Sequence, residues 1–288
     1  MNKELPIVEC IARARIPTTI DQKQHTYPEI FLHLYKNNRD NKEHLAIVFG
    51  EDIRSKSLFK RKHKNETQYE RLIRGAYIGK LEPNRLIADE YKGEKLQFDE
   101  ETGELIPNFE TNTYNKKVPV RIHSECFTGE TAWSARCDCG EQFDLAGDYI
   151  LKHGPSSLKQ RKTRCYSLPK TGRERDFSIA SSILLDLQLS EVDLLTNNPD
   201  KVKAIEIENK LKCVSRVPMV PISWKEPSNE VETVDEDEHG KHHGIKSKEI
   251  ESYLRTKIEK MGHLLTTPLT LHTNTDASSK GCYRIVIY

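Results

Sequence analysis

Three of the seven cysteines of this chain fall within fourteen residues, at Cys126, Cys137 and Cys139. Thiolates are strong ligands of zinc, and a catalytic zinc needs three protein ligands with a fourth position open. Whatever the rest of the chain folds into, it must bring these three sulfurs to one point. The other four cysteines are scattered, and we expect them to pack as small apolar residues.

The spacing of the cluster leaves the number of ligands open. A closed structural site would take a fourth ligand, for which His123, His153 and Cys165 are available. An open site would hold a water molecule, whose pKa zinc can lower from 15.7 to about 7. The cysteine pattern predicts zinc in either case.

Hydrophobic periodicity predicts a mixed α and β fold. Residues 118–122 alternate apolar and polar side chains, which is typical of a strand with one buried face. The other face would then carry Arg121, His123 and Glu125. Farther along, residues 177–187 have the apolar spacing of a helix.

A βαβ unit is expected near the end of the core. A short strand is predicted at 192–195, a helix from Asp200, and a second strand at 213–220. If the two strands are parallel, their crossover should be right-handed. Thr196, just before the helix, could face an anion or serve as an ordinary helix cap.

The sequence divides into a core and less compact segments. The charged stretch 54–74 suggests a solvated helix, and 92–115 a loop or insertion. Residues 225–246 are acidic and contain few apolar side chains, which suggests a disordered loop. No rigid element is predicted beside its histidines, so we do not expect them to bind a metal. We expect a core at 1–224, that loop at 225–246, an amphipathic helix at 247–265 capped by Ser247, and a tail at 266–288.

Composition excludes several classes of partner. Lys and Arg number 45 against 44 Asp and Glu, so a formal net charge of +1 offers no field to attract nucleic acid. No apolar run reaches the roughly 18 residues of a membrane span, and Met1–Glu9 lacks the apolar core of a signal peptide. We therefore expect a cytoplasmic protein without nucleic-acid or membrane partners.

The segment around the cysteines, HSECFTGETAWSARCDCGEQFD, resembles the signature of the GTP cyclohydrolase II family. The resemblance extends to IARARIPTT, DLLTNNPDK, RVPMVP and EIESYLRTKIEKMGHLL, and so covers most of the chain. The longer N-terminal region and the acidic loop resemble the fungal branch. The resemblance to the family implies an α/β core with a mixed sheet, and a homodimer.

The resemblance also implies a reaction and a site. The imidazole ring of GTP would be opened with release of formate and pyrophosphate, as the first step of riboflavin biosynthesis, using Zn2+ at the ring and Mg2+ at the phosphates. Cys126, Cys137 and Cys139 would hold zinc. The implied nucleotide-binding residues are Arg121, Ile122, His123, Ser124, Glu125, Gln142, Thr196 and Lys201.

One segment departs from the family. Its members carry a stretch like RQEGRGIGL and then a motif like DARDF, whereas this chain has only KHGPSSLKQRKTRCYSLPKTGRERDF at 152–177. Arg175 corresponds to the arginine proposed as catalytic nucleophile, although a guanidinium that stays protonated is better suited to stabilise phosphate charge. The family's aspartate proton acceptor falls on Arg173, which cannot accept a proton.

Two alignments of residues 171–173 remain open, because they could be a remnant of the lost loop or the replacement for the residues before RDF. The sequence accordingly supports two functions. The first is a GTP cyclohydrolase II enzyme. The second is a catalytically impaired zinc-binding relative that acts as a binding or structural protein. A zinc-dependent nucleic-acid module is disfavoured by the balanced charge.

Overall fold

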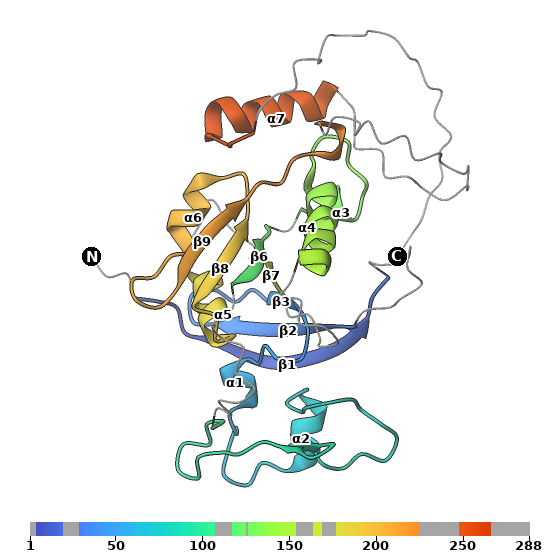
Figure 1. The fold of residues 1–288 in the computed structure, drawn as a ribbon, viewed down its shortest axis with the longest axis vertical. Helices are drawn as coiled ribbons and strands as arrows, with labels where there is room; N and C mark the ends of the chain where they lie inside the picture. The colour runs from blue at the N-terminus through green and yellow to red at the C-terminus, as the bar shows by residue number, and fades with distance from the viewer. Residues whose placement is uncertain are drawn as a thin grey trace.

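The computed structural model describes residues 4–19, 29–106, 117–124, 126–153, 164–168, 177–224 and 248–265. The first half of this length has three strands, two short helices and a two-stranded ribbon, and strands and helices alternate from β6 to β9 (Figure 1). The strands are β1 (Val8–Pro17), β2 (Glu29–Asn37), β3 (His44–Phe49), β4 (Glu90–Tyr91), β5 (Glu94–Lys95), β6 (Val118–Ile122), β7 (Arg164–Leu168), β8 (Glu191–Leu195) and β9 (Lys212–Val217). The helices are α1 (Lys56–Phe59), α2 (Gln68–Ile73), α3 (Phe127–Glu130), α4 (Cys139–His153), α5 (Ser178–Asp186), α6 (Pro199–Ile205), α7 (Lys248–Met261) and the short 3-10 helix η2 (Ile222–Trp224).

Seven of the strands form one mixed sheet, in the order β1-β2-β3-β7-β6-β8-β9. β1, β2, β3 and β7 pair antiparallel, whereas β7, β6, β8 and β9 pair parallel. The predicted mixed α and β fold with a mixed sheet is therefore confirmed. Parallel strands place their carboxyl ends at one edge of the sheet, and this edge is where ligands usually bind in such folds.

The central strand β6 is buried on both faces. All five of its residues are buried, so the prediction of one buried and one exposed face was wrong. Helix α5 packs in one hydrophobic cluster with Val118, Val120 and Ile122, while α4 packs in a second cluster with Leu195 and Met219. Strands of a parallel sheet are covered by helices on both sides, which the short alternating pattern could not reveal.

The βαβ unit lies close to its predicted position. β8 and β9 are parallel, with α6 between them. Helix α6 begins at Pro199, one residue before the predicted start, and its N-cap is Asn198, whose side chain accepts a hydrogen bond from the Asp200 amide. β9 covers 212–217 rather than 213–220, and the proline that follows it cannot donate to a sheet.

The charged stretch 54–74 is not the single solvated helix that we predicted. It contains two short helices, and Thr67 and Glu70 form a capping box at the start of α2. Arg71 is fully buried, where it donates to Asp89 Oδ1 at 2.7 Å and to Glu66 Oε2 at 3.1 Å. Its charge therefore stabilises the fold and does not face solvent.

The segment 50–106 lies against the outer edge of β1. The backbone amide of Arg13 donates to Arg74 O at 3.0 Å, and that of Cys10 donates to Ser57 Oγ at 2.8 Å. The Arg13 guanidinium also donates to Gly75 O at 2.9 Å. Polar groups of β1 that face away from β2 thus find partners in this segment.

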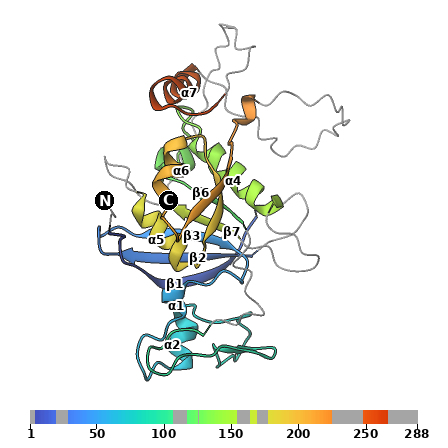
Figure 2. The same cartoon turned by 60° about the vertical axis from the view of Figure 1, so that its left-hand side comes forward.

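Figures 1 and 2 both place α7 at the opposite end of the molecule from α1 and α2, with the sheet between them. α7 lies within the amphipathic helix predicted at 247–265, and its apolar residues Ile250 and Leu254 are buried, so this helix packs against the protein. Within the described residues, no helix is both long and apolar enough to cross a membrane.

Candidate metal centre

The three cysteines of the sequence motif meet at the start of α4. Cys126 precedes α3 and Cys139 begins α4, and the three Sγ atoms lie within 4.8 Å of one another. Cys126 Sγ and Cys137 Sγ are 3.7 Å apart. Two thiolates bound tetrahedrally to zinc, with Zn–S bonds of about 2.3 Å, lie about 3.8 Å apart. This spacing fits a metal ion held by thiolates.

Of the three thiols, that of Cys139 is hard to ionise without a cation nearby. Burial, together with the neighbouring Cys137, raises the pKa of Cys139. Burial also acts to raise the pKa of Cys126, but hydrogen bonds from Thr128 and Gly129 outweigh it and lower that pKa. Zinc binds thiols as thiolates, so a divalent cation would supply the positive charge that the cluster lacks.

Gly129 makes the approach of the three sulfurs possible. A Cβ atom at this position would lie 2.7 Å from Cys137 Sγ and 3.3 Å from Cys126 Sγ. Its neighbour Gly140 is equally confined, because a Cβ there would lie 2.6 Å from Gly129 O. The two glycines let the backbones of α3 and α4 approach closely enough for one ion to bind all three thiols.

The cluster has three thiol ligands within the part of the chain that the structure describes, and no further His, Asp, Glu or Cys joins it. Of the alternative fourth ligands, His123 instead places Nε2 2.7 Å from Glu130 Oε1. The side chains of His153 and Cys165 lie outside the described residues. The described geometry is that of a three-ligand site.

The surroundings of His123 favour its neutral form. Burial, reinforced by the positive charges of Arg121 and Lys201, lowers its pKa to about 3. Its contact with Glu130 is therefore a hydrogen bond from Nε2–H, and Nδ1 is left as an acceptor, with no partner among the described residues. Glu130 also accepts from the Cys126 amide at 2.8 Å, which links the imidazole to the thiol cluster.

Two cations tie the carboxyl ends of β6 and β8 beside this cluster. Arg121 Nη1 donates to Leu195 O at 2.9 Å, and Lys201 Nζ donates to Ile122 O at 3.1 Å. Arg121 is two residues before His123 and Lys201 contacts the residue next to it, so both charges lie near this imidazole. The predicted residues Arg121, Ile122, His123 and Lys201 thus come together at the edge of the sheet where ligands bind.

Gln142 and Thr196 lie at the same edge but are deeply buried. Gln142 Nε2 donates to Met219 O at 3.0 Å, and the Thr196 amide donates to Val217 O at 3.0 Å. Asn198 caps α6, so an ordinary cap role for Thr196 was wrong. Ser124 is half-buried next to His123, whereas Glu125 and Arg175 lie outside the described residues.

Four residues of the site escaped the sequence reasoning. Glu130 and Gly129 lie within the motif itself, where their spacing from Cys126 on a helical turn was the available signal. Tyr253 and Lys257 are 114 and 119 residues away from Cys139 and Asp138, which they contact. Pairs so distant in sequence leave no local pattern.

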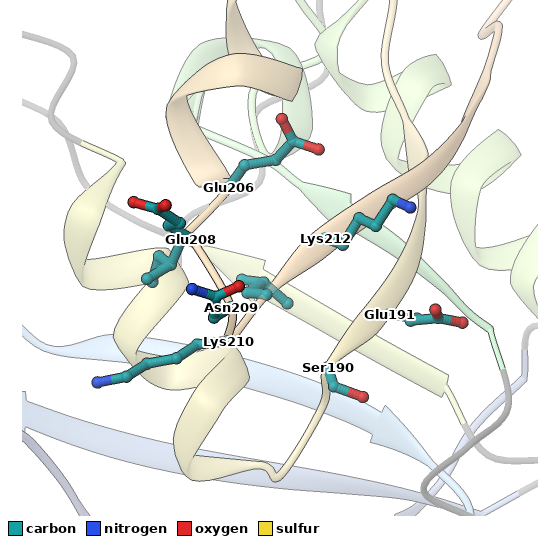
Figure 3. Close-up of a pocket in the computed structure, with 9 residues that line it drawn as sticks. Ser190, Glu191, Glu206, Glu208, Asn209, Lys210 and Lys212 are labelled. Atoms are coloured by element: carbon teal, nitrogen blue, oxygen red, sulfur yellow. The ribbon is translucent and has the colours of Figure 1, made fainter.

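A separate hollow of about 700 Å³ lies at the amino ends of β8 and β9 (Figure 3). Glu206, Glu208, Lys210 and Lys212 are among the side chains that line it. It lies at the end of these strands away from the thiols, so it does not belong to the metal centre.

Comparison with known proteins gives a consistent picture. The family model described as GTP cyclohydrolase II matches residues 98–158 and 163–218. GTP cyclohydrolase-2 of Saccharomyces cerevisiae is 52% identical over 310 residues, covering 94% of this chain and 84% of the relative. The same enzyme of Meyerozyma guilliermondii is 50% identical over 300 residues, covering 94% and 83%. Riboflavin biosynthesis protein RibBA of Chlamydia muridarum is 27% identical over 289 residues, covering 91% and 47%.

These matches also bear on the shortened segment. The alignment with the Saccharomyces cerevisiae protein runs over 310 positions, more than the 288 residues of this chain, so some of its positions have no counterpart here. The family match is interrupted at residues 159–162, within the segment that departs from the family motifs.

Proposed function

This chain belongs to the GTP cyclohydrolase II family, and we propose that it opens the imidazole ring of GTP by hydrolysis, with release of formate and pyrophosphate. This is the first step of riboflavin biosynthesis. The observation that carries the proposal is the position of three thiols beside Arg121, His123 and Lys201 at the carboxyl ends of parallel strands.

Zinc is the metal that this cluster fits best, with Cys126, Cys137 and Cys139 as its ligands. Bound there, zinc supplies a Lewis acid and a water molecule of lowered pKa. The protein's own contribution is to hold a neutral imidazole nearby. Because Glu130 engages Nε2–H, His123 Nδ1 is the atom that can accept a hydrogen bond from the reacting group.

The phosphates of GTP, with Mg2+, belong on the cationic side of the site. Arg121 and Lys201 supply positive charge there. Arg175 corresponds to the arginine that acts at the α-phosphate in the family. Residues 122–125, Gln142 and Thr196 complete the proposed nucleotide site. A homodimer and a cytoplasmic location also follow from family membership, as proposals.

A second function is favoured by the interrupted family match at 159–162. The family's glycine-rich loop would supply backbone amides and an arginine to the phosphates, and this chain lacks most of it. A zinc-binding relative with strongly reduced turnover is therefore the alternative. Its role would be binding or structural.

Formate release from GTP separates the two functions. Zinc-loaded full-length protein should bind about one zinc per chain and release formate from GTP. The Cys137→Ser variant should lose both the zinc, measured by metal analysis, and the activity. Zinc without formate would establish the impaired relative. Undiminished zinc in Cys137→Ser would remove this cluster as the metal site.

A further inference from the structure

The C-terminal helix α7 contacts the metal-binding turn directly. Tyr253 and Lys257 are four residues apart and so lie on one face of the helix. Tyr253 Oη is 4.0 Å from Cys139 Sγ, and Lys257 Nζ is 3.1 Å from Asp138 Oδ1. Asp138 lies between the two cysteines of the C-x-C pair, so both contacts reach the same short turn.

These contacts have the chemistry of outer-shell partners of a thiolate metal centre. Three thiolates around a divalent cation leave a net charge of −1, and Asp138 adds a carboxylate that is only 2% exposed. A buried carboxylate beside an anionic centre is costly unless a cation accompanies it. The Lys257 ammonium is that cation, and it also lies 4.1 Å from the centre of the Tyr253 ring.

Tyr253 is placed to donate to a metal ligand. The phenol is half-buried, and its hydroxyl is the polar group of α7 that is nearest to a ligand sulfur among the described contacts. Hydrogen bonds to ligating atoms orient them and tune how strongly they bind the metal. The contact therefore acts on Cys139 itself, whereas the contact of Lys257 acts on the turn that carries it.

We propose that Tyr253 and Lys257 are positioning residues of the metal centre, so that docking of α7 and binding of the metal stabilise each other. The inference rests on the proposed zinc site. By thermodynamic linkage, whatever free energy α7 adds to metal binding, the metal adds to the docking of α7. Apolar anchors at Ile250 and Leu254, and the hydrogen bond from the Leu264 amide to Asn197 O at 2.8 Å, orient the helix for these contacts.

The first test measures zinc release to a chromophoric chelator from the full-length, zinc-loaded protein. Tyr253→Phe and Lys257→Met should each release zinc about 10-fold faster or more, because loss of an outer-shell partner typically weakens metal binding 10- to 100-fold. Lys257→Arg keeps the charge and should restore slow release. Lys260→Met, at an exposed lysine of the same helix, is the matched control and should behave like the parent protein.

Two further readouts distinguish positioning from a general loss of stability. In the cobalt-substituted protein, Tyr253→Phe should shift the thiolate-to-cobalt charge-transfer band, which a remote structural change would leave in place. Amide hydrogen exchange over residues 248–261 should be slower with zinc than after its removal by chelator.

The outcomes separate this inference from the proposed site. A parent protein that takes up no zinc would overturn both. Zinc uptake with equal release rates in all variants, an unmoved cobalt band, and metal-independent exchange in α7 would overturn the role of α7 alone and leave the thiol site standing.

Discussion

At the scale of single residues, one missing methyl group decides whether the three thiols can meet. We predict that Gly129→Ala loses most of its bound zinc, because the new Cβ would lie 2.7 Å from Cys137 Sγ and must push the sulfur or the helix away. Metal analysis of the purified variant provides the measurement. Gly93→Ala is the control: its φ of +87° makes alanine strained there too, but its Cβ would meet nothing within 4 Å, so any loss of stability is separated from a clash with the thiols. Equal zinc content in both variants would contradict the prediction.

A buried histidine should make the fold sensitive to acid. His33 is fully buried, and burial, with Arg13 nearby, lowers its pKa from 6.5 to about 3. Below pH 6.5 the His33 imidazole therefore binds a proton in the unfolded chain, whereas in the folded chain it stays neutral until about pH 3. Stability should fall as the pH drops through this window, by up to about 1.4 kcal/mol per pH unit.

Urea unfolding at several pH values checks this prediction. Replacing His33 with Leu should flatten the fall in unfolding free energy between pH 6.5 and 4, and His123, which titrates in the same direction, should account for part of what remains. His63→Leu, at an exposed histidine, should leave the slope as it is in the parent protein. An unchanged slope in His33→Leu would mean that another group controls acid stability.

At the site, the sequence predicted the metal ligands best. Spacing alone indicated that Cys126, Cys137 and Cys139 share a metal, and the structure brings them together. The sequence could not show that Glu130 would bind His123, because that contact depends on how α3 folds back onto the end of β6. Nor could it assign Tyr253, since no short-range pattern links it to Cys139.

At the scale of elements, the buried ion pairs around α2 should dominate the stability of the N-terminal part. Arg71→Met removes the charge that Asp89 contacts at 2.7 Å, while Glu66 retains Arg74 at 2.6 Å. We expect a loss of about 3 to 5 kcal/mol in the free energy of unfolding, because one partner of a buried pair is left behind.

The measurement is the urea midpoint of Arg71→Met against that of Lys64→Met, a change of the same kind at an exposed lysine nearby. A similar midpoint for both would show that Asp89 finds another partner, such as Arg61 at 4.0 Å. In that case the burial of Arg71 would contribute little to stability.

Elements with a clear period were predictable, and those defined by long-range pairing were not. The apolar spacing in α5 and α7 and the βαβ unit at 191–217 were found from sequence. The double burial of β6 was missed because five residues are too few to distinguish a central strand from a half-exposed one. The prediction of a solvated helix at 54–74 was wrong because the sequence does not distinguish an arginine that is buried among carboxylates from one that faces solvent.

At the scale of the whole molecule, the shortened segment between α4 and α5 should limit turnover. We predict that a version with the family's RQEGRGIGL-to-DARDF stretch restored forms formate from GTP about 100-fold faster or more. Loss of one electrostatic stabiliser commonly costs about 100- to 1,000-fold in rate, and a lost general base adds to it. Zinc content must be matched between the two proteins, so that a folding defect is not mistaken for a catalytic one.

Equal formate rates would contradict this prediction, and would mean that residues 152–175 rebuild the phosphate site in another way. The prediction concerns turnover, because the thiol cluster and the strand ends that carry Arg121 and Thr196 are formed without the missing stretch.

The segment 50–106, which bonds to the outer amides of β1, has a consequence for how this protein survives in a crowded solution. A bare edge strand is a template on which another chain can add its own strand, and such additions lead to aggregates. Here the Arg13 and Cys10 amides are already engaged by Arg74 and Ser57. The segment thus hinders the addition of a foreign strand to β1, and this effect does not depend on the metal centre at the carboxyl ends of the parallel strands.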